Sequence, residues 1–191
     1  MYAKSKDAVQ QPKESDTIGN IIIYTLLGLC ILLSLFIIIG FFVLAKPLEA
    51  SLTSVAVTSL KYNDTSPYLN ATLAMEIRIE NPNFGFFEFP TSTGDILYNG
   101  RVVGEMKING QQVGSYSAIR TKVGTHVSYR EDQTPSVWFK NDIKRRLIIL
   151  KVGAKLRGEV HLGVLNKRSV NLKCLMHLNL VDEVIQRFWC K

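Results

Sequence analysis

The feature that most constrains this chain is an uncharged, largely apolar segment from Thr17 to Ala45. As a helix rising ~1.5 Å per residue it reaches roughly 40 Å, which exceeds the ~30 Å hydrocarbon thickness of a bilayer. A cleaved secretory signal is the competing interpretation, because the small residues Val43 and Ala45 precede Lys46. A signal core usually has only ~7 to 15 apolar residues, so the length favours an uncleaved signal anchor. The predicted segments are a tail at 1–17, a transmembrane helix at 18–45 and one domain at 46–191.

The charges around this segment predict its orientation. Three lysines (Lys4, Lys6 and Lys13) precede the segment, and Lys46 follows it, which favours a cytosolic N-terminus and an extracellular or lumenal domain. Two glycosylation acceptors, Asn63-Asp64-Thr65 and Asn70-Ala71-Thr72, favour the same side. The acids of the tail balance its lysines, so the formal net charge of +7 belongs to the domain. A basic domain of this kind favours anionic lipid heads or acidic wall polymers, and its location disfavours nucleic acid.

The cysteines agree with a domain outside the cytosol. Cys30 lies in the apolar segment, which leaves Cys174 and Cys190 as an even pair. Apolar residues alternate from Val170 to Leu180, the period of a strand. A chain reversal around Asp182 would place three pairs opposite each other: Leu180 and Val184, Met176 and Phe188, Cys174 and Cys190. A disulfide there would add on the order of 3 kcal/mol. The alternative is two buried thiols, since a slip of one residue would separate them.

Most of the domain has the period of β-strands. The clearest alternation runs from Leu69 to Ile79, and Asn99-Gly100 is the signal of a tight hairpin between Ile96–Tyr98 and Arg101–Val103. Further strands are expected at Leu52–Leu60, Gln112–Ile119, Thr121–Tyr129, Leu147–Leu156 and Glu159–Val164. Turns are expected at Asn109-Gly110, Gly114, Gly124, Gly158 and Asn166. Short strands at this spacing predict an antiparallel β-sandwich.

One short helix is expected among the strands. Thr134 is a suitable N-cap, and Pro135 suits the first helical position. Four apolar residues would share one face: Val137, Phe139, Ile143 and Leu147. Four cations would lie elsewhere on it: Lys140, Lys144, Arg145 and Arg146. They are interpreted either as a docking site for anionic groups or as a solvated helix end that complements the helix dipole.

The sequence contains no signature of catalysis. Its histidines, His126, His161 and His177, lack metal-ligand spacing, and Cys174 and His177 would project from opposite faces of one strand. No nucleophile elbow, phosphate-binding glycine loop or dinucleotide fingerprint is present. No two carboxylates can be assigned the separation that glycoside hydrolysis needs. The prediction is a protein that is not an enzyme and uses no metal or cofactor.

A family resemblance rests on four short segments of the chain. They are Ile79-Glu80-Asn81-Pro82-Asn83, Phe84-Gly85-Phe86-Phe87, Tyr98-Asn99-Gly100 and Val103-Gly104. With the short tail and single span, they make the chain similar over its full length to the plant harpin-induced-like (NHL) proteins, which carry the second-group late embryogenesis abundant domain. The matching motif residues are Asn81, Pro82, Asn83, Tyr98, Gly100 and Gly104. The run from Phe84 to Phe89 departs from the basic and tyrosine-rich residues that the family often has there.

The resemblance implies a single-pass plasma-membrane protein without catalytic activity. Its domain is expected to be a sandwich of the immunoglobulin or fibronectin type III kind, with roles in plant defence and stress responses. The motif also has a physical interpretation, because Pro82 lacks an amide hydrogen and so stops the strand or makes it switch sheets. Thr93-Gly94-Asp95 lies nearby and is similar to an adhesion tripeptide, although Gly-Asp is also an ordinary turn dipeptide.

Two functions follow as hypotheses. The first is a tethered interaction module that joins the membrane to extracellular proteins or wall polymers. The second is a lipid-handling sandwich with an acyl chain between its sheets, lined by Leu69, Leu73, Ile77, Phe86, Phe87 and Phe89. The candidate lipid contacts are Phe84, Phe86, Phe87 and Phe89, which are otherwise explained by core packing or by a ligand slot. The sequence does not identify a partner or an oligomeric state.

Overall fold

The computed structural model describes residues 14–43, 46–130, 137–161 and 165–191 of the chain. The chain divides into two compact units, Met1–Ala45 and Lys46–Lys191. The first contains helix α1, Glu14–Val43, which begins inside the predicted tail rather than at residue 18. Within it, Ile18–Gly40 has a mean hydropathy of 2.9 with none of its side chains buried. In the part of the chain that the structure describes, this is the one helix long and apolar enough to cross a membrane.

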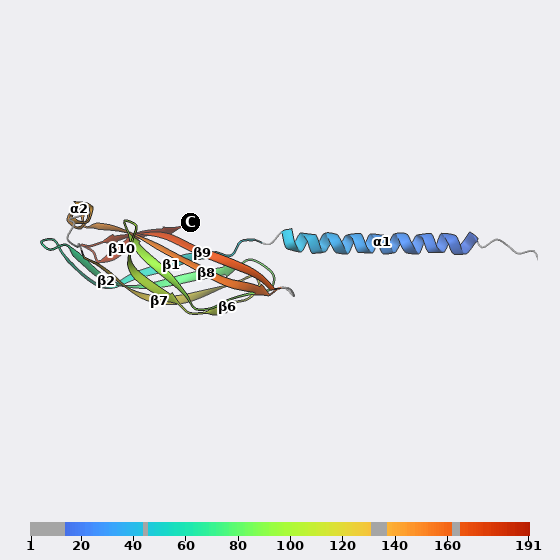
Figure 1. The fold of residues 1–191 in the computed structure, drawn as a ribbon, viewed down its shortest axis with the longest axis horizontal. Helices are drawn as coiled ribbons and strands as arrows, with labels where there is room; N and C mark the ends of the chain where they lie inside the picture. The colour runs from blue at the N-terminus through green and yellow to red at the C-terminus, as the bar shows by residue number, and fades with distance from the viewer. Residues whose placement is uncertain (1–13, 44–45, 131–136, 162–164) are drawn as a thin grey trace, which may run out of the picture. The chain divides into compact units, whose positions relative to one another are not determined.

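The second unit is mainly β, as predicted, and its described residues form ten strands and one short helix (Figure 1). The strands are β1 Glu49–Asn63, β2 Tyr68–Asn81, β3 Phe86–Phe89, β4 Ser92–Tyr98, β5 Arg101–Ile108, β6 Gln111–Val113, β7 Ser117–Arg130, β8 Leu147–His161, β9 Leu165–Asn179 and β10 Val184–Cys190. All of their pairings are antiparallel.

The strands form one continuous sheet that curls back on itself. Its main path is β1-β2-β7-β5-β4-β8-β3-β6, and β9 pairs with both β8 and β10. Strand β1 lies against β9 and β10, where the Leu52 amide donates a hydrogen bond to Cys190 Sγ at 3.3 Å. The two ends of the sheet therefore meet, which gives the sandwich-like or barrel-like form expected for a mainly β domain.

The core is made by the inward face of each strand. In β2, which lies between β1 and β7, the predicted alternation is confirmed. Its buried side chains are Leu69, Ala71, Leu73, Met75, Ile77 and Ile79. The predicted hairpin between β4 and β5 is also confirmed: Asn99 and Gly100 have φ values of 46° and 82°, the positive values that a two-residue turn of this type needs.

Three glycine and asparagine turns were predicted wrongly. Gly124 lies in the middle of β7, Gly158 lies inside β8, and Asn166 pairs with Val160 in the β8–β9 ladder. The predicted strand Gln112–Ile119 is instead split by a turn at 114–116. Gly158 is explained by close approach: a Cβ there would overlap the Glu88 carbonyl oxygen, because β3 pairs with β8 next to this residue.

Helix α2, Val137–Arg145, agrees in part with the expected helix. Phe139 and Ile143 are buried as predicted, whereas Thr134, Pro135 and the side chain of Val137 lie outside the described residues. The prediction that Leu147 belongs to this helix is wrong, since it begins β8. Arg146, with φ 60°, is the reason: its left-handed conformation ends the helix, and its carbonyl accepts a hydrogen bond from the Leu180 amide at 3.0 Å.

The terminal hairpin joins β9 to β10. Met176 lies opposite Phe188, and Cys174 lies opposite Cys190 with a disulfide between them. The predicted pairing of Leu180 with Val184 is wrong, because Val184 pairs with Asn179. A bulge between Ile185 and Arg187 then shifts the register by one residue and brings the cysteines opposite each other.

Candidate anion-binding groove

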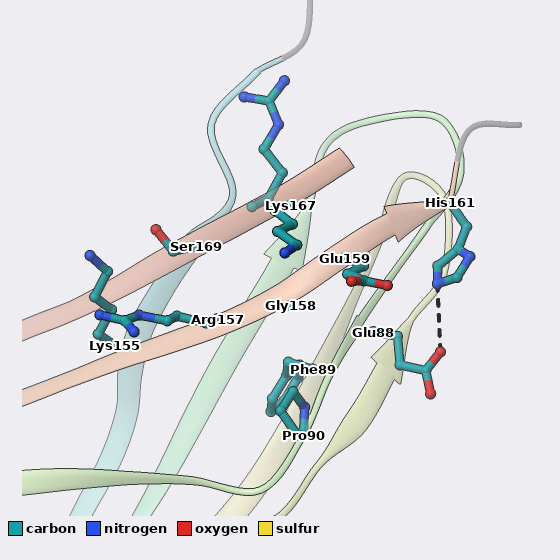
Figure 2. Close-up of a pocket in the computed structure, with 11 residues that line it drawn as sticks. Glu88, Phe89, Pro90, Lys155, Arg157, Gly158, Glu159, His161, Lys167 and Ser169 are labelled. Atoms are coloured by element: carbon teal, nitrogen blue, oxygen red, sulfur yellow. Dashed lines mark ion pairs between the residues drawn. The ribbon is translucent and has the colours of Figure 1, made fainter. Parts of the chain in front are cut away.

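A surface groove of about 750 Å³ lies where β3 meets β8 and β9 (Figure 2). Strands β8 and β9 supply one wall, and the end of β3 supplies the other. The side chains and backbone that line it are those of Glu88, Phe89, Pro90, Lys155, Arg157, Gly158, Glu159, His161, Lys167, Arg168 and Ser169. We call this feature the basic groove.

The strand period explains why these residues gather. On β8 the even-numbered Ala154, Leu156 and Val160 are buried, so the odd-numbered Lys155 and Arg157 face outward. The register places Arg157 opposite Ser169, Lys155 opposite Asn171, and Glu159 opposite Lys167. Because paired strands lie ~4.7 to 4.9 Å apart, cations from two strands share one outer face.

The electrostatics of the basic groove are positive. Four cations (Lys155, Arg157, Lys167 and Arg168) line it together with two carboxylates, Glu88 and Glu159. The ion pairs of the described residues are Arg78–Glu80, Arg146–Asp64 and His161–Glu88, so none of the four groove cations has a carboxylate partner within 4.0 Å. Exposed cations without partners are available to a ligand with anionic groups.

His161 closes one end of the groove. Its ring stacks on Phe86, with centroids 4.3 Å apart and planes at 15°, and its Nε2 lies 3.7 Å from Glu88 Oε2. Figure 2 shows His161 and Glu88 facing each other at the end of β8. The contact fixes the ring in place. Among the described residues, no group of three or more histidines, cysteines or acids is arranged to hold a metal.

A second hollow of about 620 Å³ continues the same surface along β4, β8 and β9. It shares Pro90, Lys155 and Arg157 with the basic groove and adds Lys173. Lys155 and Arg157 therefore lie where the two hollows join. The outer face formed by β8 and β9 thus presents positive charge over a longer path than either hollow alone.

The asparagine-proline-asparagine motif lies elsewhere and has internal partners. Asn81 is 0% exposed; its Nδ2 donates to the carbonyls of Gly85 (2.8 Å) and Gly114 (3.1 Å), and its Oδ1 accepts from the Asn83 amide at 3.1 Å. The Asn83 side chain donates to the Lys46 carbonyl at 2.8 Å. Pro82 ends β2 between them. These contacts make the motif a fastening between loops.

The other family-motif residues also have structural partners. Tyr98 donates its hydroxyl hydrogen to Asp142 Oδ2 at 2.7 Å and packs edge-on against Tyr129 and Phe139, which holds α2 on the sheet. A Cβ at Gly104 would lie 2.6 Å from the His126 carbonyl oxygen, because β5 and β7 pass closely there. With Gly100 in the β4–β5 turn, none of these residues lines the basic groove.

The four phenylalanines do not act as a set. Phe87 and Phe89 are core residues, which removes them from contact with a bilayer surface, and their rings stack with centroids 5.7 Å apart. Phe86 is half-buried against His161. Phe84 is 56% exposed. Only Phe84 of the predicted lipid contacts therefore presents most of its ring to the outside.

The remaining predicted sites lie on β1, β2 and β4. Asn63 is exposed at the end of β1, and its Oδ1 accepts from the amides of Thr65 and Ser66. Asn70 is half-buried in β2 and accepts a hydrogen bond from the Ser128 hydroxyl at 2.7 Å. The interpretation of Gly94-Asp95 as a turn dipeptide is wrong, since Thr93-Gly94-Asp95 lies in β4 between β5 and β8.

The basic groove was not predicted from the sequence, although cations at alternating strand positions indicate it. Lys151, Lys155 and Arg157 occupy alternating outward positions of β8, and Lys167 and Lys173 do so on β9. The sequence instead directed the prediction of an anion-docking site to the cations of the helix, because they lie close together along the chain. Cations at period two on neighbouring strands converge only after the strands pair.

Comparison with known proteins adds the family. No family model matches the chain. It is 32% identical over 204 residues to late embryogenesis abundant protein At1g64065 of Arabidopsis thaliana, covering 100% of this chain and 94% of that protein. The chain belongs to the late embryogenesis abundant family. This confirms the family resemblance found in the sequence.

Solved structures similar to this late embryogenesis abundant chain are more distant. One is the X-ray structure of a Northeast Structural Genomics Consortium target, SoR45, at TM-score 0.42 and 10% identity, covering 68% of this chain and 87% of that one. Another is the solution structure of a candidate late embryogenesis abundant protein, At2g46140.1, at TM-score 0.32 and 11% identity, covering 68% and 74%. Because both TM-scores lie below 0.5, the family assignment rests on the sequence relative.

Proposed function

We propose that this late embryogenesis abundant protein is a non-enzymatic interaction module anchored in the plant plasma membrane and active in defence and stress responses. Helix α1 is the anchor, and the domain at 46–191 offers its basic groove to an anionic partner outside the cell. The family supports the stress-related role, and the length and apolar composition of α1 support the anchor. The lysines before the span and the two acceptor sequences support the orientation.

The observation that carries the proposal is the set of four groove cations that have no carboxylate partner among the residues that the structure describes. Alternate residues of a strand lie roughly 6.6 Å apart, so Lys155 and Arg157 repeat positive charge at that interval along β8. Lys167 and Lys173 extend the pattern on β9. A row of charges along two strands matches a linear polyanion better than a single small anion. We therefore assign the groove to an acidic polymer of the cell wall.

Binding of an acidic polysaccharide tests this assignment. The full chain in phosphatidylcholine nanodiscs is titrated with oligogalacturonate, and binding is followed by biolayer interferometry. Arg157→Glu combined with Lys167→Glu should weaken binding at least about tenfold, or ~1.4 kcal/mol. Added salt should weaken binding of the unaltered protein, because exposed charges are screened.

The matched control is Lys140→Glu combined with Lys144→Glu, which makes the same change of net charge on α2. Binding should stay within about twofold of the unaltered protein, because these cations lie outside the groove. An equal loss in the control would reduce the effect to net charge. A larger loss in the control would assign the polymer to α2 instead of the groove.

Glycosylation tests the proposed orientation. The protein expressed in plant cells should shift on a gel after enzymatic deglycosylation, and Asn63→Gln combined with Asn70→Gln should abolish the shift. Asn63 should carry most of it, since its side chain is exposed at the end of β1. Digestion of residues 46–191 by protease added to the cytosolic side would reverse the orientation.

The alternative function is lipid handling between the sheets. Leu69, Leu73 and Ile77 would line such a slot, together with Phe87 and Phe89, and all five are buried in the packed core cluster. Opening a slot would separate these contacts, so the packing supports the interaction module. Native mass spectrometry of the full chain distinguishes the two functions: a retained lipid that survives delipidation would favour lipid handling.

A further inference from the structure

A second surface lies apart from the polymer-binding groove, where the chain enters the domain. The Lys46 carbonyl accepts a hydrogen bond from the Asn83 side chain, and the Asn83 carbonyl accepts one from the Tyr116 amide at 3.1 Å. The start of the domain, the β2–β3 loop and the β6–β7 turn are thus fastened together. Two large aromatic side chains project from these fastened segments: Phe84, 56% exposed, and Tyr116, 71% exposed. We call Lys46, Phe84 and Tyr116 the entry surface.

Tyr116 has an unusual backbone conformation for a residue on an exposed surface. Its φ is 47°, in the left-handed region that is unfavourable for a residue with a side chain. Glycine takes this conformation readily, and asparagine does so more often than bulky residues. The hydrogen bond from the Tyr116 amide to the Asn83 carbonyl accounts for the turn, but it does not account for an exposed aromatic ring at this position. An observed strain of this kind points to a contact that the ring makes outside the chain.

The short connection between α1 and the domain indicates that this contact is with the bilayer. Lys46 is the third residue after Val43, where α1 ends, and three extended residues reach at most about 11 Å. If α1 crosses the bilayer to its end, this reach holds the entry surface at the headgroup layer. Tyrosine and lysine are suited to that layer, because each combines an apolar body with a polar tip.

We propose that Lys46, Phe84 and Tyr116 dock the domain onto the phospholipid headgroup and upper acyl region of the bilayer that α1 crosses. The inference rests on the membrane anchoring in the proposed function, but not on the polymer. Docking would limit the tilt of the domain. It would also fix the position of the basic groove, because Phe86, two residues after Phe84, stacks on His161 at the end of the groove.

Photocrosslinking tests the proposal on the full chain in phosphatidylcholine nanodiscs. Tyr116 is replaced by p-benzoylphenylalanine, which keeps an aromatic side chain at the position, and Phe84 is replaced in the same way in a second variant. After irradiation, intact-protein mass spectrometry should find a phosphatidylcholine adduct on each variant. Peptide mapping should place the adduct at the altered residue.

The matched control is p-benzoylphenylalanine in place of Trp138, which is also 71% exposed. Trp138 belongs to α2, and the neighbouring Phe139 packs on Tyr129 with centroids 4.5 Å apart. Tyr129 lies near the end of β7, whereas Tyr116 comes just before its start, so Trp138 is far from the entry surface. Its adduct yield should be at least about fivefold lower. Equal yields at all three positions, or none at 84 and 116, would overturn the proposal.

The outcomes also separate this inference from the proposed function. A chain that fails to enter nanodiscs would contradict both, because neither then has an anchor. A chain that enters nanodiscs and binds oligogalacturonate without lipid adducts would contradict the docking alone. Tyr116→Asn supplies a second measurement. Because asparagine tolerates the left-handed conformation better, the melting temperature should rise. Because the docking contact is lost, hydrogen exchange of the β6–β7 turn in nanodiscs should increase.

Discussion

Two regions of the domain differ in how well the sequence indicates their role: the loop at Asn81-Pro82-Asn83 and the outer face of β8 and β9. The loop is the most recognisable motif of the chain, yet the Asn81 side chain is buried and bonded to the backbone on three sides. The outer face has no recognisable motif, yet it carries four groove cations without carboxylate partners among the described residues. A motif can therefore mark a structural constraint, whereas binding capacity follows from groups that the fold leaves available.

The largest effect that tests this comparison is expected at Asn81. Asn81→Ala removes three hydrogen bonds made by a fully buried side chain, so the free energy of unfolding should fall by about 3 kcal/mol. Thermal unfolding of the full chain in detergent, followed by circular dichroism, measures it. Asn83→Ala, which removes one side-chain hydrogen bond in the same loop, should cost about 1 kcal/mol. Equal losses would show that the buried contacts of Asn81 have no special weight.

A smaller effect is expected at Gly158, the residue of the groove that is most constrained by packing. Gly158→Ala places a methyl group against the Glu88 carbonyl and the Phe87 ring, which should lower the free energy of unfolding by about 2 kcal/mol. The same denaturation measurement applies. Gly124→Ala is the control, because a Cβ there meets nothing within 4 Å. A loss as large at Gly124 would indicate that glycine in these strands matters for a reason other than the close approach of β3.

The smallest effect on stability is expected at the groove cations themselves. Lys155→Ala and Lys167→Ala should each change the free energy of unfolding by no more than about 0.5 kcal/mol, since both side chains are exposed and form no ion pair with a described residue. The same variants should weaken oligogalacturonate binding. A large loss of stability here would end the distinction between a structural motif and an available surface.

Much of the fold was predictable because its signals are local. The alternation in β2 and the Asn-Gly hairpin each depend on a few consecutive residues, and both predictions are confirmed. The wrong predictions have a common cause. Gly124 and Gly158 were predicted to be turn residues because glycine is common in turns, but both lie inside strands. At Gly158 a glycine is needed because β3, a distant segment of the chain, lies against it.

The candidate site was less predictable than the fold. The Leu180–Val184 pairing failed because a bulge at the hairpin shifts the register, and neither strand encodes that bulge in an obvious way. The basic groove was not predicted because its cations come from residues 155–157 and 167–168, which come together only when β8 pairs with β9 on one side and with β3 on the other. Tyr116 drew no attention because its strained backbone is visible only in the folded chain.

The apolar helix, the mainly β character of the domain, its positive charge and the family could all be inferred before the chain is folded. These properties depend on composition and on periods of two or more residues along one segment, which folding does not alter. The tertiary structure alone decided that Asn81 is a buried fastening, that Phe87 and Phe89 belong to the core, and that cations from two strands share a groove. Those properties depend on which distant segments meet, and that is decided by burial and by the hydrogen bonding of the whole sheet.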